Sequence, residues 1–263
     1  MKSQVLANQK GGVGKSAVAV QMAYFFYLLM NKRVLVVDLD HQGNTSKAIA
    51  KSGLAAVSRI SASQILTSKD VSIEDGAFVV ISADDELRDL EKQGSRHNEF
   101  ANNFYSFLKA MDQKFDICLI DTNPNPDIRQ LAALVVCDFV LSPIQLNQEA
   151  IDGIGDLLNH ERTGIRKIKA AINPKLELIG ILPNIVEPTP FQRENLTELS
   201  AHFARLLIPL QSGGFAAIKK TTAIPEAQAA GLPVWKLGKT CGREAWTHIR
   251  PVFEKIAATM GVH

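Results

Sequence analysis

The feature that most constrains the fold is a glycine-rich stretch, ANQKGGVGKSAV (Ala7 to Val18), that lies between two apolar segments. The run QVLAN before it is typical of a short buried strand, and KSAVAVQMAYFFYLLMNK after it is long enough for a helix of about four turns. In a strand–loop–helix unit, the backbone N–H groups of the loop and the helix N-terminus converge on phosphate oxygens. The stretch therefore predicts a phosphate-binding loop at the carboxyl end of the first strand.

Five further apolar runs indicate the rest of the sheet: RVLVVDLD, AFVVISAD, FDICLIDT, DFVLSPI and LELIGILPNIV. Runs rich in Val, Ile and Leu without polar alternation are typical of strands buried on both faces, and helical segments between them indicate parallel pairing. We expect one α/β domain over residues 1–263, with a doubly wound, mostly parallel sheet flanked by helices. Its ligand should lie outside the carboxyl ends of the strands.

Composition excludes several classes of protein. The longest apolar run is interrupted by Gln21 and is too short to span a bilayer, and the N-terminus shows no secretory signal. Cys118, Cys137 and Cys241 have neither metal nor redox spacing, so we expect reduced, buried thiols in a cytoplasmic protein.

The glycine loop contains the groups that a phosphate site needs. Gly11, Gly12 and Gly14 permit close backbone approach, Lys15 neutralises phosphate charge, and the Ser16 hydroxyl is a ligand for Mg²⁺. The usual pattern G-x-x-x-x-G-K-[ST] is altered at its start, where Gln9 replaces the first glycine and Lys10 adds a second lysine. A solvated loop charge is the alternative interpretation of Lys10.

Three carboxylates follow predicted strands. Asp121 ends FDICLID and is expected in the Mg²⁺ shell, although such an Asp can instead cap a helix. Asp38 and Asp40 end VLVVDLD on one side of a strand, and Asp40, entering the next loop, is placed to orient an attacking water. A simple Asx turn is the alternative for this pair.

These residues together resemble the ParA/MinD family of P-loop ATPases. KGGVGKS resembles the family's deviant Walker A box, DLDHQGNTS its DxDPQGN switch, LIDTNP its Walker B strand, and IPEAQAAGLPVW its C-terminal segment. The resemblance covers essentially the whole chain and is strongest to plasmid partition ATPases of ParA type. It implies an ATPase that uses ATP and Mg²⁺, with slow hydrolysis.

The resemblance also implies roles for individual residues. Lys10 would reach the phosphates of the other subunit in a nucleotide-sandwich dimer. Asp38 would support the metal and the switch, and Asn184 lies where family members often contact the base. The implied catalytic residues are Lys10, Lys15 and Asp40, the implied metal residues are Ser16, Asp38 and Asp121, and the implied nucleotide-binding residues are Lys10, Gly11, Gly12, Val13, Gly14, Lys15, Ser16, Ala17 and Asn184.

Two residues depart from the family pattern. His41 replaces the usual proline of DPQGN, which removes a fixed φ from the switch loop, and Asn123 replaces the usual proline or alanine after Asp-Thr. Neither change removes a catalytic group. Because both lie within the motifs of the site, we expect them to affect the rate of hydrolysis. A solvent-facing side chain is the alternative for His41.

The C-terminal segment separates this chain from other relatives. Five of its apolar residues have the spacing of the core face of a last helix: Ala245, Ile249, Val252, Phe253 and Ile256. The segment lacks the cluster of basic and bulky apolar residues with which a MinD-type membrane helix ends. No C-x-x-C supports an iron–sulfur cluster, and we expect neither membrane binding nor a helix-turn-helix extension before the first strand.

Basic residues supply candidates for DNA binding. The net charge is only +2, but residues 211–263 hold seven Lys/Arg against three Glu. We define the basic set as Lys219, Lys220, Lys236, Lys239, Arg243 and Arg250, and a smaller cluster consists of Arg166, Lys167 and Lys169. For any one of these residues, an ordinary surface charge is the alternative.

The resulting prediction is a nucleoid-associated partition ATPase. Its ATP dimer would bind non-specific DNA, and a ParB-like centromere-binding partner would stimulate hydrolysis and release. The alternatives are a positioning ATPase of the same fold that acts on a protein or membrane cargo, and a nucleotide-gated scaffold without catalysis.

Overall fold

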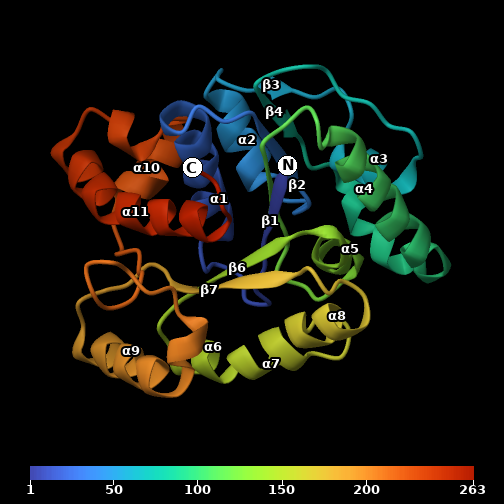
Figure 1. Cartoon of the computed structure of the whole chain (residues 1–263). Helices are drawn as coiled ribbons and strands as arrows, with labels where there is room; N and C mark the ends of the chain where they lie inside the picture. Colours follow the sequence, from blue (N-terminus) through green and yellow to red (C-terminus); the bar gives the residue numbers. More distant parts are fainter.

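The computed structural model describes residues 1–263 and contains one seven-stranded parallel sheet (Figure 1). The strand order is β3-β4-β2-β5-β1-β6-β7, and every pairing is parallel. The strands are β1 (Lys2–Leu6), β2 (Val34–Asp38), β3 (Ala56–Val57), β4 (Phe78–Ile81), β5 (Ile117–Asp121), β6 (Phe139–Ile144) and β7 (Glu177–Pro183). The predicted doubly wound, parallel P-loop fold is confirmed.

The central strands are buried on both faces, as their unbroken apolar runs predict. The first strand begins two residues earlier than QVLAN and ends before Ala7. In register, Asp121 of β5 lies opposite Asp38 of β2 and Leu6 of β1, so these strands end level with one another. The sheet thereby brings the glycine loop and two acidic strand ends to a single edge.

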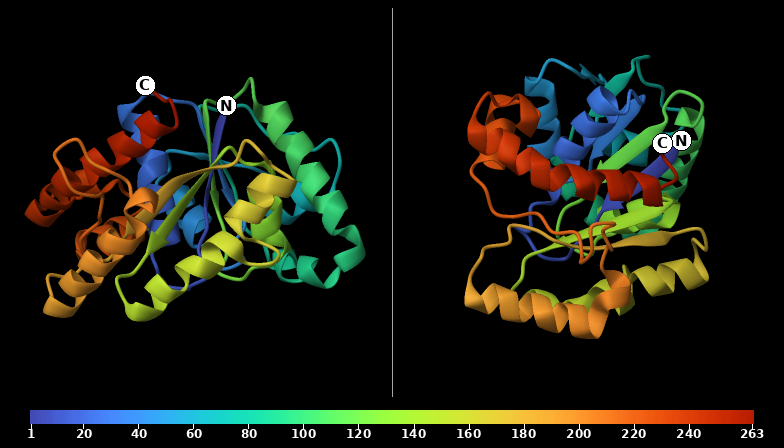
Figure 2. Two further views of the ribbon diagram at one scale, coloured as in Figure 1. Left: turned by 60° about the horizontal axis from the view of Figure 1, so that its bottom comes forward. Right: turned by 60° about the vertical axis from the view of Figure 1, so that its left-hand side comes forward.

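Helices cover both faces of the sheet (Figure 2). On one face α1 (Lys15–Tyr24), α2 (Asn44–Lys51), α10 (Ala223–Ala230) and α11 (Thr240–Thr259) enclose one apolar cluster. The other cluster is enclosed by α3 (Ala62–Thr67), α4 (His97–Met111), α5 (Ile128–Val136), α6 (Gln148–Asp152), α7 (Ile154–Asn159), α8 (Ile165–Ala171) and α9 (Pro190–Phe203). Short 3₁₀ turns are η2 (Asp85–Arg88), η3 (Leu90–Lys92), η4 (Gly94–Arg96), η5 (Ala204–Leu206) and η6 (Val234–Lys236).

The helix predicted after the glycine loop is not α-helical throughout. It is α-helical to Tyr24 and continues as a π-helical turn, η1 (Phe25–Leu29). The ring of Phe25 lies 5.8 Å from that of Phe253 and 6.0 Å from that of Trp246, both on α11. The five residues predicted for the core face of α11 are all buried, so that prediction is confirmed.

The cysteine thiols are free, as expected, but only two of them are buried. Cys118 in β5 and Cys137 after α5 are buried, and burial raises the pKa of both thiols. Cys241 is half-buried. No helix in the structure combines the length and the apolar character that crossing a membrane requires.

Candidate functional site

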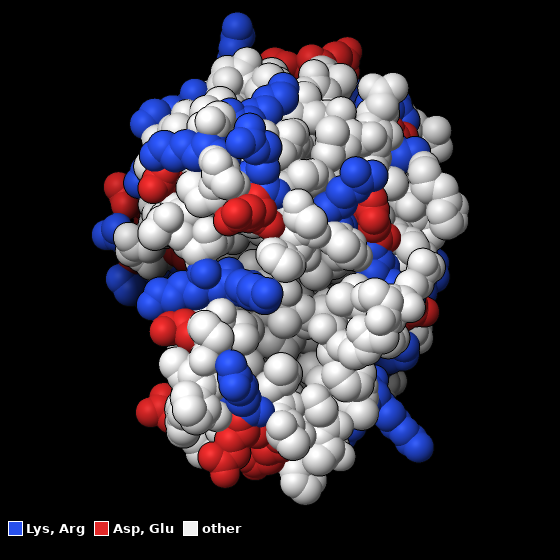
Figure 3. All heavy atoms as spheres, turned by 90° about the vertical axis from the view of Figure 1, so that its left-hand side faces the viewer, with Lys and Arg blue, Asp and Glu red and all other residues white.

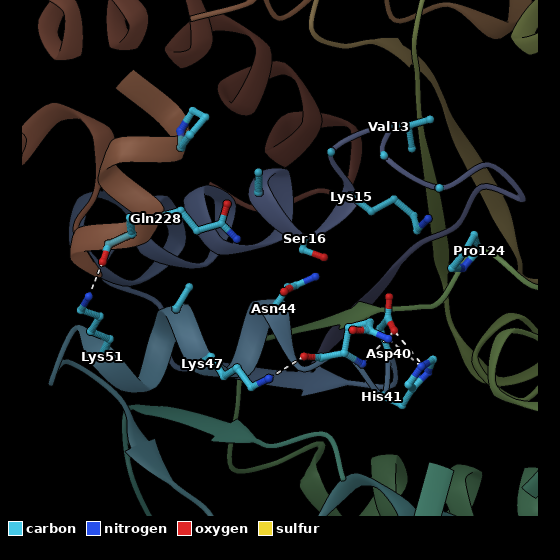
Figure 4. A pocket seen from close by; sticks show the side chains of 18 of the residues that line it. Val13, Lys15, Ser16, Asp40, His41, Asn44, Lys47, Lys51, Pro124 and Gln228 are labelled. Atoms are coloured by element: carbon cyan, nitrogen blue, oxygen red, sulfur yellow. Dashed lines mark hydrogen bonds and ion pairs between the residues drawn. The ribbon is translucent and has the colours of Figure 1, made fainter. Parts of the chain in front are cut away.

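A cavity of about 840 Å³ opens at the carboxyl edge of the sheet (Figure 4). Residues 11–17 of the glycine loop and α1 form one wall. A second wall is formed by residues 40–42 of the loop between β2 and α2, which we call the second loop, and by residues 44, 47, 48 and 51 of α2. Residues 124–125 after β5 and residues 225, 228 and 229 of α10 complete the cavity. The cavity thus joins all the segments that the sequence marks for phosphate chemistry.

The glycine loop is held by side chains from distant strands. Asn184, directly after β7, donates from Nδ2 to the Val13 carbonyl oxygen at 2.8 Å, and Gln145 donates from Nε2 to the Gly12 carbonyl oxygen at 3.0 Å. Gly14 begins α1 with a φ of +84°, and a Cβ there would lie 2.3 Å from Asn184 Nδ2. Glycine is required at this position by both backbone angle and space.

Lys15 lies inside the loop and is only 6% exposed. Its Nζ donates to the carbonyl oxygens of Asn8 at 3.2 Å and Lys10 at 3.3 Å. Burial lowers the pKa of Lys15, and the charges of Asp121 and Asp40 oppose that shift. The structure therefore places a desolvated cation beside two carboxylates.

Asp38 and Asp121 are fully buried on neighbouring strands. The Asp121 Oδ2 accepts a 2.6 Å hydrogen bond from the Thr45 hydroxyl, whereas its Oδ1 is buried without a partner. Asp38 accepts bonds from the backbone N–H of Ser46 at 2.8 Å and of Asp40 at 3.2 Å, which fixes the second loop. Burial, and then the charge of Asp121, raise the pKa of Asp38 to about 7.

These residues fit a magnesium ion. The unpaired Asp121 Oδ1 is an available oxygen ligand, and Ser16 lines the cavity in the first turn of α1. No three His, Cys, Asp or Glu side chains converge into a complete metal site. A cation held here would take its remaining ligands from phosphate oxygens and water, as Mg²⁺ does in nucleotide sites.

Asp40 lines the cavity in the loop between β2 and α2, and its side chain is 13% exposed. One oxygen, Oδ1, accepts a 3.1 Å hydrogen bond from the Gln42 backbone N–H. Gly43 then begins α2 with a φ of +66°. This loop fixes the backbone around Asp40 and leaves the carboxylate facing the cavity.

The two residues that depart from the family pattern meet in one hydrogen-bonded chain. Asn123 donates from Nδ2 to Asp127 Oδ2 at 2.9 Å, and Asp127 pairs with the buried Arg129. The Arg129 Nη1 lies 3.0 Å from His41 Nδ1, which lies 3.6 Å from Asp40 Oδ1. His41 is therefore engaged with the protein interior rather than directed only to solvent.

Lys10 directly precedes Gly11, the first residue of the loop that lines the cavity, and does not line the cavity itself. Its side chain is 34% exposed, and its Nζ pairs with Glu149 Oε2 at 2.9 Å. The backbone N–H of Lys10 donates to Asn8 Oδ1 at 2.7 Å, which fixes the chain at the start of the loop. The two lysines of the loop thus occupy different environments, one buried and one at the surface.

A smaller, mostly apolar pocket of about 190 Å³ adjoins the loop at Gly14 and Ala17. Asn184 and Ile185 line it from the end of β7, and residues 218–221 line it from the segment before α10. The structure therefore brings Asn184 to this pocket and not to the larger cavity.

Sequence reasoning missed several cavity residues. Lys47 and Lys51 lie one turn apart on α2, and both line the cavity together with Gln228 of α10. Their i, i+4 spacing after the second loop was an available signal, because such residues share a helix face. Gln145, which supports the loop without lining the cavity, offered no signal, since its contact with Gly12 spans 133 residues of sequence.

All six members of the basic set are exposed on the segments around α10 and α11. The face that carries these helices shows Lys and Arg gathered in several places, with Asp and Glu among them (Figure 3). Lys220, Lys239 and Arg250 pair with Glu187, Glu226 and Glu254, respectively. Lys219, Lys236 and Arg243 have no acidic partner.

Comparison with known proteins agrees with this geometry. A family model described as an AAA domain matches residues 1–178. Protein IncC of Escherichia coli is 33% identical over the whole chain and 71% of IncC, and the chromosome-partitioning ATPase Soj of Thermus thermophilus is 31% identical over 75% of each chain. An ATP complex of a Cyanothece McdA variant superposes with a TM-score of 0.77 at 18% identity, over 100% of this chain and 97% of McdA, which shows the shared fold. From these matches and the motifs at its site, the chain belongs to the ParA-type partition ATPases of the ParA/MinD family.

Proposed function

We propose that this chain hydrolyses ATP slowly and couples it to DNA partition, with an ATP-bound sandwich dimer that binds DNA without sequence preference. The observation that carries the proposal is the different placement of two lysines in one loop. Lys15 is buried at the phosphate loop, whereas Lys10, before the first glycine of the loop, pairs at the surface with Glu149. A cation in that position can reach the phosphates of a second subunit, which would make dimerisation depend on ATP.

Each part of the site has a role in this proposal. Residues 11–17 hold the phosphates, and the apolar pocket beside Asn184 receives the adenine. Ser16 and Asp121 hold Mg²⁺, supported by Asp38, and the bound ion neutralises phosphate charge. Asp40 accepts a hydrogen bond from the attacking water.

The basic set supplies phosphate contacts to DNA. Its members are exposed and come from one part of the chain, and phosphate contacts of this kind are independent of base sequence. A partner resembling ParB, bound at a centromere-like site, stimulates hydrolysis and releases the dimer. Such a protein works in the cytoplasm in association with the nucleoid.

The test is binding to non-specific duplex DNA without nucleotide, with ADP and with ATP, each at low and moderate salt. Binding that requires ATP and weakens with salt supports the proposal. Absence of DNA binding in every nucleotide state would overturn it, and binding to liposomes or to protein cargo would then favour a positioning ATPase.

A further inference from the structure

The guanidinium group of Arg129 is held rigidly beside the second loop. Its side chain is 5% exposed, and its Nε lies 3.2 Å from Asp127 Oδ1 and 3.1 Å from Asp127 Oδ2. Asp127 is itself fixed, because it caps α5 by accepting from the Arg129 backbone N–H at 3.0 Å. Its Nη2 also donates to Asp127 Oδ2, and its Nη1 is directed at His41 Nδ1 at 3.0 Å.

This contact decides the tautomer of His41. A guanidinium group has N–H donors and no acceptor, so His41 Nδ1 must accept and its ring proton lies on Nε2. The Nε2 of His41 lies 2.8 Å from the amide nitrogen, Nε2, of the exposed Gln42 side chain. Since two N–H groups cannot bond to each other, this tautomer requires the Gln42 amide to be rotated by 180°, so that its oxygen accepts from the ring.

The tautomer matters because of Asp40. Its Oδ1 lies 3.6 Å from His41 Nδ1. A proton on Nδ1 would be donated to this carboxylate after a small movement, in addition to the bond that Oδ1 already accepts from the Gln42 backbone N–H, and would make the carboxylate a weaker acceptor for water. We propose that Arg129 is a positioning residue for hydrolysis: it selects the His41 tautomer that leaves Asp40 free to accept a hydrogen bond from water. This inference rests on the role of Asp40 in the proposed function.

The same hydrogen-bonded chain connects His41 and Asn123. Asn123 donates to Asp127 Oδ2 at 2.9 Å and so supports the carboxylate that orients Arg129. His41 is the side chain on which Arg129 acts. Both departures from the family pattern therefore belong to one arrangement.

The first test is the ¹⁵N NMR spectrum of the histidine side chains in the protein without nucleotide, at one fixed, mildly alkaline pH. The variant carries Arg129→Met together with Asp127→Asn, because removal of both charges avoids an unpaired buried ion and Asn retains the helix cap. We expect His41 Nδ1 to be unprotonated in the parent and to gain proton occupancy in the variant. An unchanged His41 tautomer would overturn the proposal.

The chain offers a matched control for this experiment. Arg162 contacts His97 Nδ1 at 2.9 Å and pairs with Glu91, away from the cavity. Arg162→Met should change the His97 signals and leave those of His41 unchanged. A change at His41 in this control would show that its signals respond to general perturbation, and would also overturn the assignment.

The second test is single-turnover hydrolysis. The Arg129→Met/Asp127→Asn variant should be slower by about tenfold with unchanged ATP affinity, and the same pair of changes should have no further effect in a His41→Ala background. If the double change slowed hydrolysis equally in the parent and in the His41→Ala background, Arg129 would have only a structural role. Absence of hydrolysis by the parent would instead refute the proposed function, and the NMR result would still decide the tautomer.

Discussion

The side-chain amide of Asn184 and the carbonyl oxygen of Val13, 171 residues apart in sequence, form a buried hydrogen bond of 2.8 Å. The bond ties the end of β7 to the middle of the glycine loop. A loop carbonyl that has a donor partner is fixed in orientation, so neighbouring N–H groups keep the orientation that phosphate requires. The affinity for ATP should therefore depend on a residue that is outside the phosphate motif.

Asn184→Ala should lower the free energy of unfolding by about 1–3 kcal/mol and also weaken ATP binding, because the Val13 carbonyl loses its partner. The matched control is Asn103→Ala, which removes a buried 2.8 Å bond to the Leu66 carbonyl oxygen away from the site. Urea unfolding and titration with a fluorescent ATP analogue measure the two effects. Equal ATP affinity for Asn184→Ala and the parent would contradict the prediction.

Asp38 should contribute a loss of stability to the nucleotide-free protein as pH rises from about 4 to 7. The pKa of Asp38 is about 7 in the folded chain, above the value of about 3.9 in an unfolded one, so the folded state binds the extra proton in this window. The contribution is at most about 1.4 kcal/mol per pH unit. Asp38→Asn should flatten the dependence of the unfolding free energy on pH. The control variant Asp152→Asn, at an exposed position, should keep the pH dependence of the parent. Parallel curves of unfolding free energy against pH for Asp38→Asn and the parent would disprove the assignment to Asp38.

Asp40→Ala should retain ATP binding but slow hydrolysis by about a hundredfold or more, because in the proposed function the carboxylate contacts the attacking water rather than the nucleotide. The ATP-bound dimer should then persist after free ATP is removed. Its lifetime can be followed by light scattering. Equal lifetimes for variant and parent would exclude Asp40 from the reaction.

Lys10→Ala should abolish dimerisation that depends on ATP, because no cation then reaches the phosphates of the other subunit from this position. Glu149→Gln is the informative comparison, since it releases Lys10 from its ion pair without altering the lysine. An exposed ion pair contributes little to stability, so this variant should dimerise with ATP at least as well as the parent. Unchanged dimers of Lys10→Ala would remove the trans role.

The unpaired members of the basic set should contribute more to DNA binding than the paired ones. Replacing Lys219, Lys236 and Arg243 with Ala should weaken binding of the ATP form and reduce the salt slope by about 0.9 for each DNA phosphate that the variant no longer neutralises. The matched triple variant at the three paired positions changes the net charge equally. It should have the smaller effect, because each paired cation must first leave its glutamate; equal effects would contradict this ordering.

The sequence predicts those parts of the molecule whose physics is local. Unbroken apolar runs predict the buried strands, and the polar residues that follow them predict which edge carries the site. β3 is missed because it has only two residues, both exposed. The π-helical turn after Tyr24 is missed because an apolar run does not reveal where the helix changes its hydrogen-bonding pattern.

The site is predictable only as far as its motifs extend. Lys15, Asp38 and Asp121 are each positioned by the segment that contains them. The donors that support the loop, Gln145 and Asn184, and the contact between Arg129 and His41 depend on the packing of distant segments. Asn184 could be placed near the site by resemblance, but its bond to the loop could not.

The segment before α10, residues 218–221, forms part of a pocket wall and also reaches the surface of the molecule. The Val186 N–H donates to the Ile218 carbonyl oxygen at 3.0 Å, and the Lys220 N–H donates to the Val186 carbonyl oxygen at 2.9 Å, so this segment is pinned to the chain just beyond Asn184. It lines the apolar pocket and also carries Lys219 and Lys220. Any displacement of this segment moves a pocket wall and two surface cations together. If the pocket receives adenine and the two lysines contact DNA, as the proposed function has it, one extended segment connects the two binding events, and their coupling does not require rearrangement of the sheet.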